Sequence, residues 1–193
     1  GQIALGFAPT PPDCSVTGCG WPERFAQTLP ADWVSGVYAI TLTIPGHQSQ
    51  HMFVLRAAQP AARICMVLAT GTWCAYNDWG GSNHYQGLTG PEGGDFAPHV
   101  SILRPWARGF VGWPHDAPRS PHASSRLTRP RYPHMDYARA KGVSKKYASS
   151  GWAAFERPFA LWCEGQGITL DYATQHDLHR NPALLDGYDR ALI

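Results

Sequence analysis

The sequence predicts an α/β fold in which a parallel sheet follows an antiparallel β hairpin. The run "ARICMVLAT", residues 62–70, is continuously apolar, as expected for a strand buried on both faces of a parallel sheet. After it come a long connection, a helix, a strand, a short helix and a third strand, which is the order typical of a parallel α/β sheet. The hairpin is predicted by alternating, β-branched sequence that precedes this run.

Composition limits the function before any motif is considered. The chain has 193 residues, 16% charged residues and a net charge of +2, which does not favour nucleic acid, a membrane surface or disorder as its context. No apolar run approaches the roughly 20 residues that span a bilayer. Five cysteines, an odd number, indicate free thiols and a cytoplasmic protein, although Cys14 and Cys19 are close enough in sequence to pair or to share a metal.

Residues 1–60 are expected to form a β-rich N-terminal segment. The first 30 residues are irregular and rich in Pro and Gly. Residues 37–44 and 51–56 then alternate on either side of Pro45-Gly46, which predicts an antiparallel hairpin.

Residues 61–193 are expected to be the first part of an α/β catalytic domain. Segments 62–70, 168–173 and 189–193 should be parallel neighbours in one sheet, with a helix over 153–163 on its face. Ser150 is the expected N-cap of that helix, and Pro158 should kink or restart it. The apolar side chains that share one face of the helix are Trp152, Phe155, Phe159, Trp162 and Cys163. The third strand stops at Ile193 without a polar tail, so we expect further polypeptide to complete the working protein.

A basic, loop-rich insertion is expected over about residues 88–150. Between Arg104 and Lys146 the chain has ten Lys and Arg against two Asp, and six prolines up to Pro133 argue against helix. Two interpretations remain open: a solvated loop or subunit contact, and a rim that attracts anions to a site.

The polar motif "TGTWCAYNDWGGSNHYQG" comes directly after the first buried strand, where ligands bind in open α/β sheets. Tyr76 and Tyr85 flank Gly80-Gly81-Ser82, a turn that can bring two phenol oxygens together. As phenolates they are hard ligands for a trivalent metal, and as phenols they are ordinary packing residues.

Five other residues of the motif have two interpretations each. Asn77 and Asp78 are turn formers or supports for a ligand or water, and His84 is a substrate donor or a solvated side chain. Trp73 and Trp79 are walls of an apolar pocket or ordinary core residues.

A second polar cluster, "TQHDLH", follows the second strand. His176 and His179 have the spacing of metal ligands on a helix, while Asp177 between them suits a helix N-cap.

These residues resemble the family of the large (beta) subunit of N,N-dimethylformamidase, in its C-terminal domain. The motif "TWCAYNDWGGSNHY" is similar to the family pattern T-W-x-A-Y-N-x-W-G-G-x-S-L-Y. Supporting similarity is found in "LPADWVSGVYAITL", in "VSILRPWARGF" and in "FERPFALWCEGQGITLDYATQHDLH", so that the resemblance covers about residues 30–193.

The resemblance implies a class I glutamine amidotransferase-like sheet and the hydrolysis of a small alkyl amide at a mononuclear ferric iron. Two tyrosines and a glutamate hold that iron in the family. The tyrosines fall on Tyr76 and Tyr85, with Tyr132 as an alternative for the second. The glutamate belongs to a segment after residue 193, so a further polypeptide and an oligomer are expected as partners. Asn77, Asp78 and His84 are then candidate catalytic residues, and Trp73 and Trp79 candidate pocket residues.

Two competing functions remain open. One is a cysteine hydrolase on the same sheet with Cys74 as nucleophile, which would need a His partner and a glycine elbow that "TWCAY" lacks. The other is a non-catalytic module that binds carbohydrate or a protein partner through its tryptophans and the basic insertion.

Overall fold

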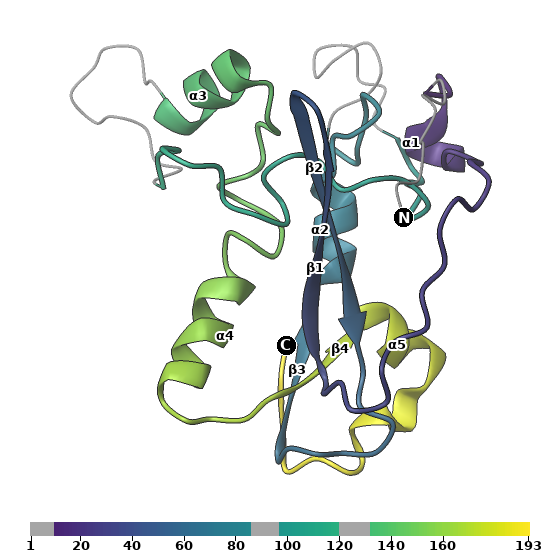
Figure 1. The fold of residues 1–193 in the computed structure, drawn as a ribbon, viewed down its shortest axis with the longest axis vertical. Coiled ribbons are helices and arrows are strands. Elements are labelled where there is room, and N and C mark those ends of the chain that lie inside the picture. Colours follow the sequence, from purple (N-terminus) through teal and green to yellow (C-terminus); the bar gives the residue numbers. More distant parts are fainter. Residues whose placement is uncertain (1–9, 86–96, 120–131) are drawn as a thin grey trace.

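The computed structural model describes residues 10–85, 97–119 and 132–193, and shows a parallel sheet beside a long two-stranded hairpin (Figure 1). Strands β1 (Gly36–Ile44) and β2 (His47–Leu55) pair antiparallel along their whole length. The predicted hairpin is therefore confirmed. Its second strand begins earlier than expected because Gly46, at φ 76°, makes the turn tight enough for His47 to pair with Ile44.

The parallel sheet has three strands: β3 (Ile64–Leu68), β4 (Asp171–Thr174) and β5 (Arg190–Leu192). Their order is β4-β3-β5, and both neighbours run parallel to β3. This confirms the three predicted strands as parallel neighbours. The fold is thus mixed α/β with one antiparallel and one parallel sheet, while the amidotransferase-like architecture remains a prediction.

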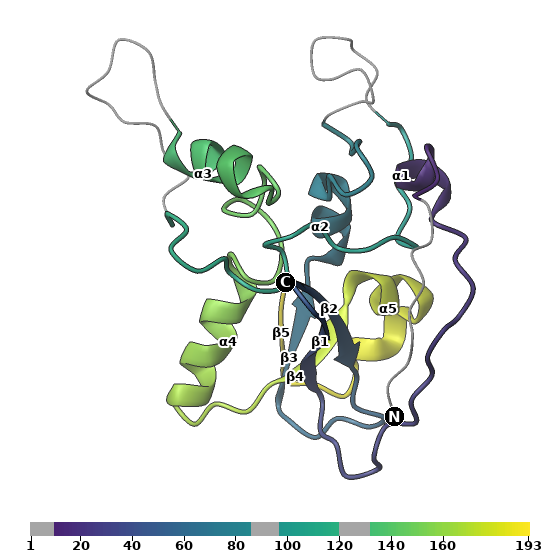
Figure 2. The same ribbon diagram turned by 45° about the horizontal axis from the view of Figure 1, so that its top comes forward.

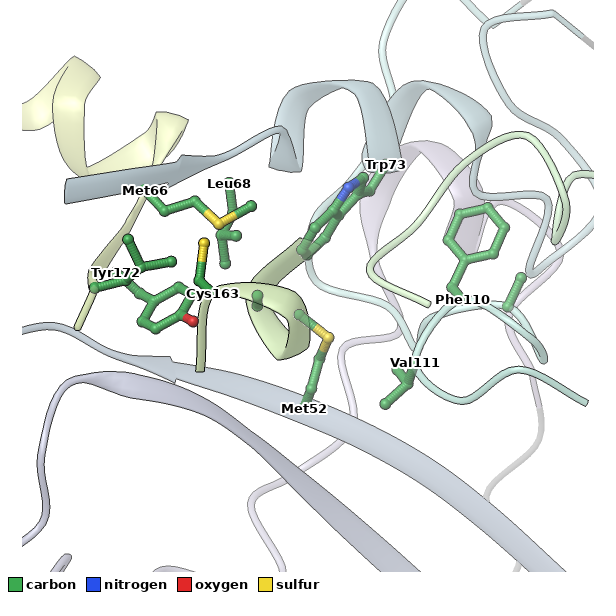
Figure 3. Close-up of a cluster of buried hydrophobic side chains, with 11 residues drawn as sticks. Met52, Met66, Leu68, Trp73, Phe110, Val111, Cys163 and Tyr172 are labelled. Atoms are coloured by element: carbon green, nitrogen blue, oxygen red, sulfur yellow. The ribbon is translucent and has the colours of Figure 1, made fainter. Parts of the chain in front are cut away.

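The central strand β3 is buried on both faces, which explains its unbroken apolar sequence. Met66 and Leu68 belong to the main hydrophobic cluster, while Cys65 and Val67 face a second one. Figure 3 shows side chains of β3, the hairpin, the helix at residues 156–165 and the 110–111 loop gathered in the main cluster. Its labelled members are Met52, Met66, Leu68, Trp73, Phe110, Val111, Cys163 and Tyr172.

Helix α4 (Glu156–Gly165) covers one side of the sheet, and α5 (Gln175–Arg180) lies on the other side in both ribbon views (Figures 1 and 2). The helix predicted over 153–163 exists, but Ser150 does not cap it. The chain makes turns up to Phe155, the residue at the N-cap position, so Pro158 falls in the first turn, where proline causes no kink.

The apolar face predicted for this helix is only partly buried in the chain. Ala160 and Cys163 face the core. Phe155, Phe159 and Trp162 are instead 60%, 39% and 55% exposed. A helix whose aromatic side chains remain in solvent has an apolar surface beyond the one that contacts the sheet.

The remaining helices are short. They are α1 (Cys14–Thr17), α2 (Thr70–Tyr76), α3 (Pro133–Lys141) and the 3-10 turn η1 (Pro182–Leu185). Helix α3 corrects the expectation that prolines keep the insertion free of helix, because Pro133 occupies the first helical position, where a missing N–H costs nothing. The predicted loop-rich stretch 88–150 lies partly outside the described residues.

Two polar side chains fix the strands to one another. Asp171 accepts hydrogen bonds from the backbone N–H of Ala61 and Ala62 and from the Tyr188 hydroxyl, at 2.7, 3.1 and 3.1 Å. Ser35 accepts one from the N–H of Tyr172 at 2.8 Å, which ties the hairpin base to β4.

The cysteines and the lack of a long apolar run were the two features of composition with structural consequences. All five cysteines are buried and free, as expected. Among the described residues, no helix combines the length and the apolar character that a membrane crossing requires.

Candidate functional site

Helix α2 places the motif at the carboxyl edge of the parallel sheet. A single residue, Ala69, separates it from β3, and it ends at Tyr76, where Asn77 turns the chain into an extended conformation at ψ 107°. Trp73 is buried in the core, and Tyr76, one turn later, packs only partly against it. The site therefore lies at the carboxyl end of the central strand of the parallel sheet.

The two predicted tyrosines lie together. Their rings stack with centroids 4.4 Å apart and planes 20° from parallel. Interaction with the Tyr85 phenol is the main cause that raises the pKa of Tyr76; burial and the negative charge of ionised Tyr85 add to it. The two phenol rings therefore lie side by side at the edge of the site.

Asn83 holds the two tyrosines in this arrangement. Its amide Nδ2 donates to the carbonyl of Tyr76 at 3.1 Å, and its Oδ1 accepts from the N–H of Tyr85 at 2.8 Å. The side chain is fully buried. Sequence analysis missed this residue, because an Asn two positions before a Tyr carries no recognisable pattern.

Arg104 holds the loop that joins the tyrosines. Its guanidinium donates to the carbonyl oxygens of Asn77, Trp79 and Ser82 at 2.8, 2.5 and 2.9 Å. Arg104 is only 5% exposed. Burial lowers the pKa of its guanidinium, which nevertheless remains charged because no neutral Arg is populated near neutral pH. A buried cation here fixes three carbonyls of one loop at once.

The side chain of Asn77 forms three hydrogen bonds with backbone groups. Its Nδ2 donates to the carbonyl of Pro105 at 3.0 Å, and its Oδ1 accepts from the N–H groups of Trp79 and Ala107 at 3.2 and 3.0 Å. It is 2% exposed. These contacts give Asn77 a role in loop geometry, which was one of its two predicted interpretations.

A second clamp comes from the N-terminal segment. The Ser15 and Ser82 hydroxyls form a buried hydrogen bond of 2.6 Å. Cys14 Sγ lies so close to Gly80 that a Cβ there would be 2.5 Å from the sulfur, and Gly80 has φ 86°. The glycine at position 80 is thus required by its backbone conformation and by its neighbour.

Basic residues of the insertion reach the motif. Besides Arg104, the ammonium of Lys146 lies over the ring of Tyr76, 5.4 Å from its centroid. Burial raises the pKa of Asp78, opposed by hydrogen bonds from the Ser144 hydroxyl and the Lys145 backbone. The insertion therefore places positive charge beside the phenol pair.

His84 is oriented by backbone groups on both sides. Its N–H donates to the carbonyl of Ala75 at 3.1 Å, and Nδ1 lies 2.7 Å from the carbonyl of Ala97. Because a carbonyl accepts, Nδ1 must carry the proton, which leaves Nε2 as an acceptor in the neutral ring.

The two tryptophans have different neighbours. Trp79 meets Trp21 edge to face, with ring centroids 5.8 Å apart. Trp73 is among the residues that line a pocket of about 380 Å³ beside β3 and β5. Its indole Nε1 donates to Glu156 Oε1 at 2.8 Å. Glu156 is a further residue that sequence analysis missed.

Three alternatives from the sequence lose support. Cys74 is buried and burial raises the pKa of its thiol, contrary to what a nucleophile needs. Asp177 closes a capping box with Thr174, so it serves helix α5 from the third position rather than as its N-cap. Within the described residues, no three His, Cys, Asp or Glu side chains gather as a metal site, so His176 and His179 have no such partners there.

Tyr132, the alternative second ligand, lies at the start of α3. Its described ring contact is with His134, at a centroid distance of 6.1 Å. Of the two candidates for a partner to Tyr76, it is Tyr85 that stacks on Tyr76.

Comparison with known proteins gives one family. The family model described as N,N-dimethylformamidase beta subunit-like, C-terminal, matches residues 4–193. No curated protein matches the chain.

Proposed function

Since the chain belongs to the N,N-dimethylformamidase beta subunit-like, C-terminal family, we propose that it hydrolyses the C–N bond of a small alkyl amide at a mononuclear ferric iron. Tyr76 and Tyr85 are the proposed ligands from this chain. The observation that carries the proposal is the stacked pair of Tyr76 and Tyr85 rings at the carboxyl edge of a parallel sheet.

The donor set fits a hard trivalent ion. The two rings stack with centroids 4.4 Å apart, so their hydroxyls can face one ion after losing their protons, and phenolates are hard anionic donors. A ferric ion held there would polarise an amide carbonyl and lower the pKa of a bound water. A third, carboxylate ligand from further polypeptide is part of the proposal.

Other residues of the chain position the two tyrosines and place a positive charge beside them. Asn83 and Arg104 set the positions of Tyr76 and Tyr85 through backbone atoms. Lys146 brings a positive charge beside Tyr76, where it favours negative charge on a bound substrate oxygen. His84 offers Nε2 as a proton acceptor.

The partners and location are part of the same proposal. The family description names a beta subunit, which supports assembly with another polypeptide. Five free thiols support a cytoplasmic location.

The test is a comparison of the full-length protein with Tyr76→Phe and Tyr85→Phe. Each change removes one phenolate but keeps the ring that stacks. We expect loss of bound iron, of the visible phenolate-to-iron absorption and of amide hydrolysis, with a stability loss of no more than about 1 kcal/mol from the missing hydroxyl. Iron content, the absorption spectrum and the melting temperature measure these.

Tyr38→Phe is the matched control, since its hydroxyl donates to the carbonyl of Val34 in the hairpin. It should keep iron and activity. A Tyr76→Phe protein with full iron content would refute the ligand assignment, and loss of iron in Tyr132→Phe but not in Tyr85→Phe would move the second ligand to residue 132.

A further inference from the structure

The pocket beside Trp73 contains a carboxyl group, that of Glu156, which forms no ion pair with any described residue. It lies at the carboxyl ends of β3 and β5 and is lined mostly by apolar residues, among them Met66, Phe155, Phe159 and Leu192. Glu156 is the one charged residue in the described lining. An apolar pocket with a single acidic group at the carboxyl edge of a parallel sheet is typical of a small-ligand site.

One oxygen of the Glu156 carboxyl group accepts a hydrogen bond, and the other has no partner. Oε1 accepts the Trp73 indole N–H at 2.8 Å, while Oε2 is buried without a hydrogen-bond partner. Burial raises the pKa of this carboxyl, although the Trp73 indole and the backbone N–H groups of Glu156 and Ala69 act in the opposite direction. A buried polar atom without a partner is costly, and in native proteins it has a specific explanation, such as a bound ion or water or a functional role.

A second unpaired atom lines the same pocket. Ser150 is 1% exposed, and its Oγ is also buried without a partner. A hydroxyl and a carboxylate oxygen that both lack partners can accept hydrogen bonds from one ligand. The pocket therefore offers acceptors to a donor ligand and an uncompensated negative charge to a cation.

We propose that this pocket binds a small alkylammonium ion, with Glu156 Oε2 as the acceptor of its N–H group and the apolar walls around its alkyl carbons. A cation supplies the charge that Glu156 lacks, and its N–H satisfies Oε2. Both oxygens are covered in this structure, so binding includes a small movement of the side chains that cover them. The choice of ligand rests on the proposed function, because hydrolysis of an alkyl amide releases an alkylamine that is protonated near neutral pH.

Trp73 is the reporter of this site. Its indole N–H bonds the same carboxylate, so a cation on Oε2 changes the electron density that Oε1 offers and shifts the indole resonance. In the full-length protein labelled with ¹⁵N-tryptophan, Trp73→Phe identifies that resonance. Titration with dimethylammonium chloride should shift it to saturation, without metal and without turnover.

Two comparisons make the titration specific. Tetramethylammonium has the same charge but no N–H, so its affinity should be lower by roughly tenfold, the value of one hydrogen bond to a charged group. Glu156→Gln should weaken dimethylammonium binding by a similar factor or more. Glu164→Gln, which changes an exposed acid of the same helix, should leave the affinity unchanged.

The titration tests the ammonium pocket independently of the proposed iron site. No saturable shift in the wild-type protein, a shift that sodium chloride reproduces, or equal affinity for the two ammonium ions would each overturn it, even if Glu156→Gln failed to fold. Binding that Tyr76→Phe leaves intact supports the pocket whether or not iron is found. Loss of iron from Tyr76→Phe, with no ammonium binding in any variant, would support the proposed function and reject this pocket.

Discussion

Two regions of the molecule differ in which side chains they bury: the loop between Tyr76 and Tyr85, and the β1–β2 hairpin. At the loop, polar side chains are buried and bonded to backbone: Arg104, Asn77 and Asn83, which we name the Arg104 network. On the hairpin, apolar side chains are in solvent, with Ile40, Leu42 and Ile44 exposed by 40%, 50% and 45%. The comparison teaches that stability near the candidate site depends on a few specific donors, whereas the hairpin should tolerate most single changes.

The largest effect is expected from Arg104→Gln. It leaves the carbonyls of Asn77, Trp79 and Ser82 without their shared donor, which should cost about 4 kcal/mol in the free energy of unfolding. Denaturant unfolding measures this. Arg108→Gln, at an exposed residue with one 3.2 Å hydrogen bond to the carbonyl of Gly142, should cost less than about 0.5 kcal/mol. Similar losses in the two variants would contradict the distinction.

Asn77→Ala should rank second. It removes three hydrogen bonds to backbone groups that are buried or partly buried, at Pro105, Trp79 and Ala107, with an expected loss of about 3 kcal/mol. The same unfolding measurement applies. Asn181→Ala, at an exposed position after helix α5, provides the control and should change little. A loss below about 1 kcal/mol at position 77 would mean that water replaces the amide.

Gly80→Ala should cost about 2 kcal/mol. The new Cβ meets Cys14 Sγ at 2.5 Å, and φ 86° is unfavourable for alanine. Melting curves of Gly80→Ala, Cys14→Ala and the double variant separate the two causes. We expect the double variant to lose less than the sum of the single losses, because the clash disappears while the backbone strain remains. Strict additivity would show that the clash does not matter.

The smallest effect is expected on the hairpin. Leu42→Thr removes apolar surface that is half in solvent and keeps a residue suited to strands, so the loss should be below about 0.5 kcal/mol. Thermal unfolding of the full-length protein tests it. A loss above about 2 kcal/mol would reveal that another part of the protein covers this face.

The strands were predictable from the sequence, and the helices around the site were not. β3 was found because a central parallel strand is apolar on both faces, and the hairpin because its alternation brackets a Pro-Gly turn. Helix α2 was missed because Gly71 and two threonines are weak helix formers, and the packing of Trp73 decides its conformation instead. For α3, the proline that argued against a helix in fact begins it.

The candidate site was predictable in part for a similar reason. The glycines between Tyr76 and Tyr85 indicated a turn that could bring the rings together, and the structure places them in contact. The roles of Arg104 and Glu156 could not be predicted. The partners of Arg104 are backbone carbonyls, and Glu156 bonds Trp73, which is 83 positions away in the sequence. Contacts of this kind leave no local pattern in a single sequence.

The hydrogen bonds of Arg104 determine how the candidate site responds to salt. Its described partners are carbonyl dipoles, and in the part of the chain that the structure describes no carboxylate forms an ion pair with it. Dissolved ions screen exposed charges such as the Arg63–Asp189 pair, but they do not enter a buried array of hydrogen bonds. The arrangement of the phenol pair is therefore built to persist in concentrated electrolyte, where surface ion pairs no longer contribute.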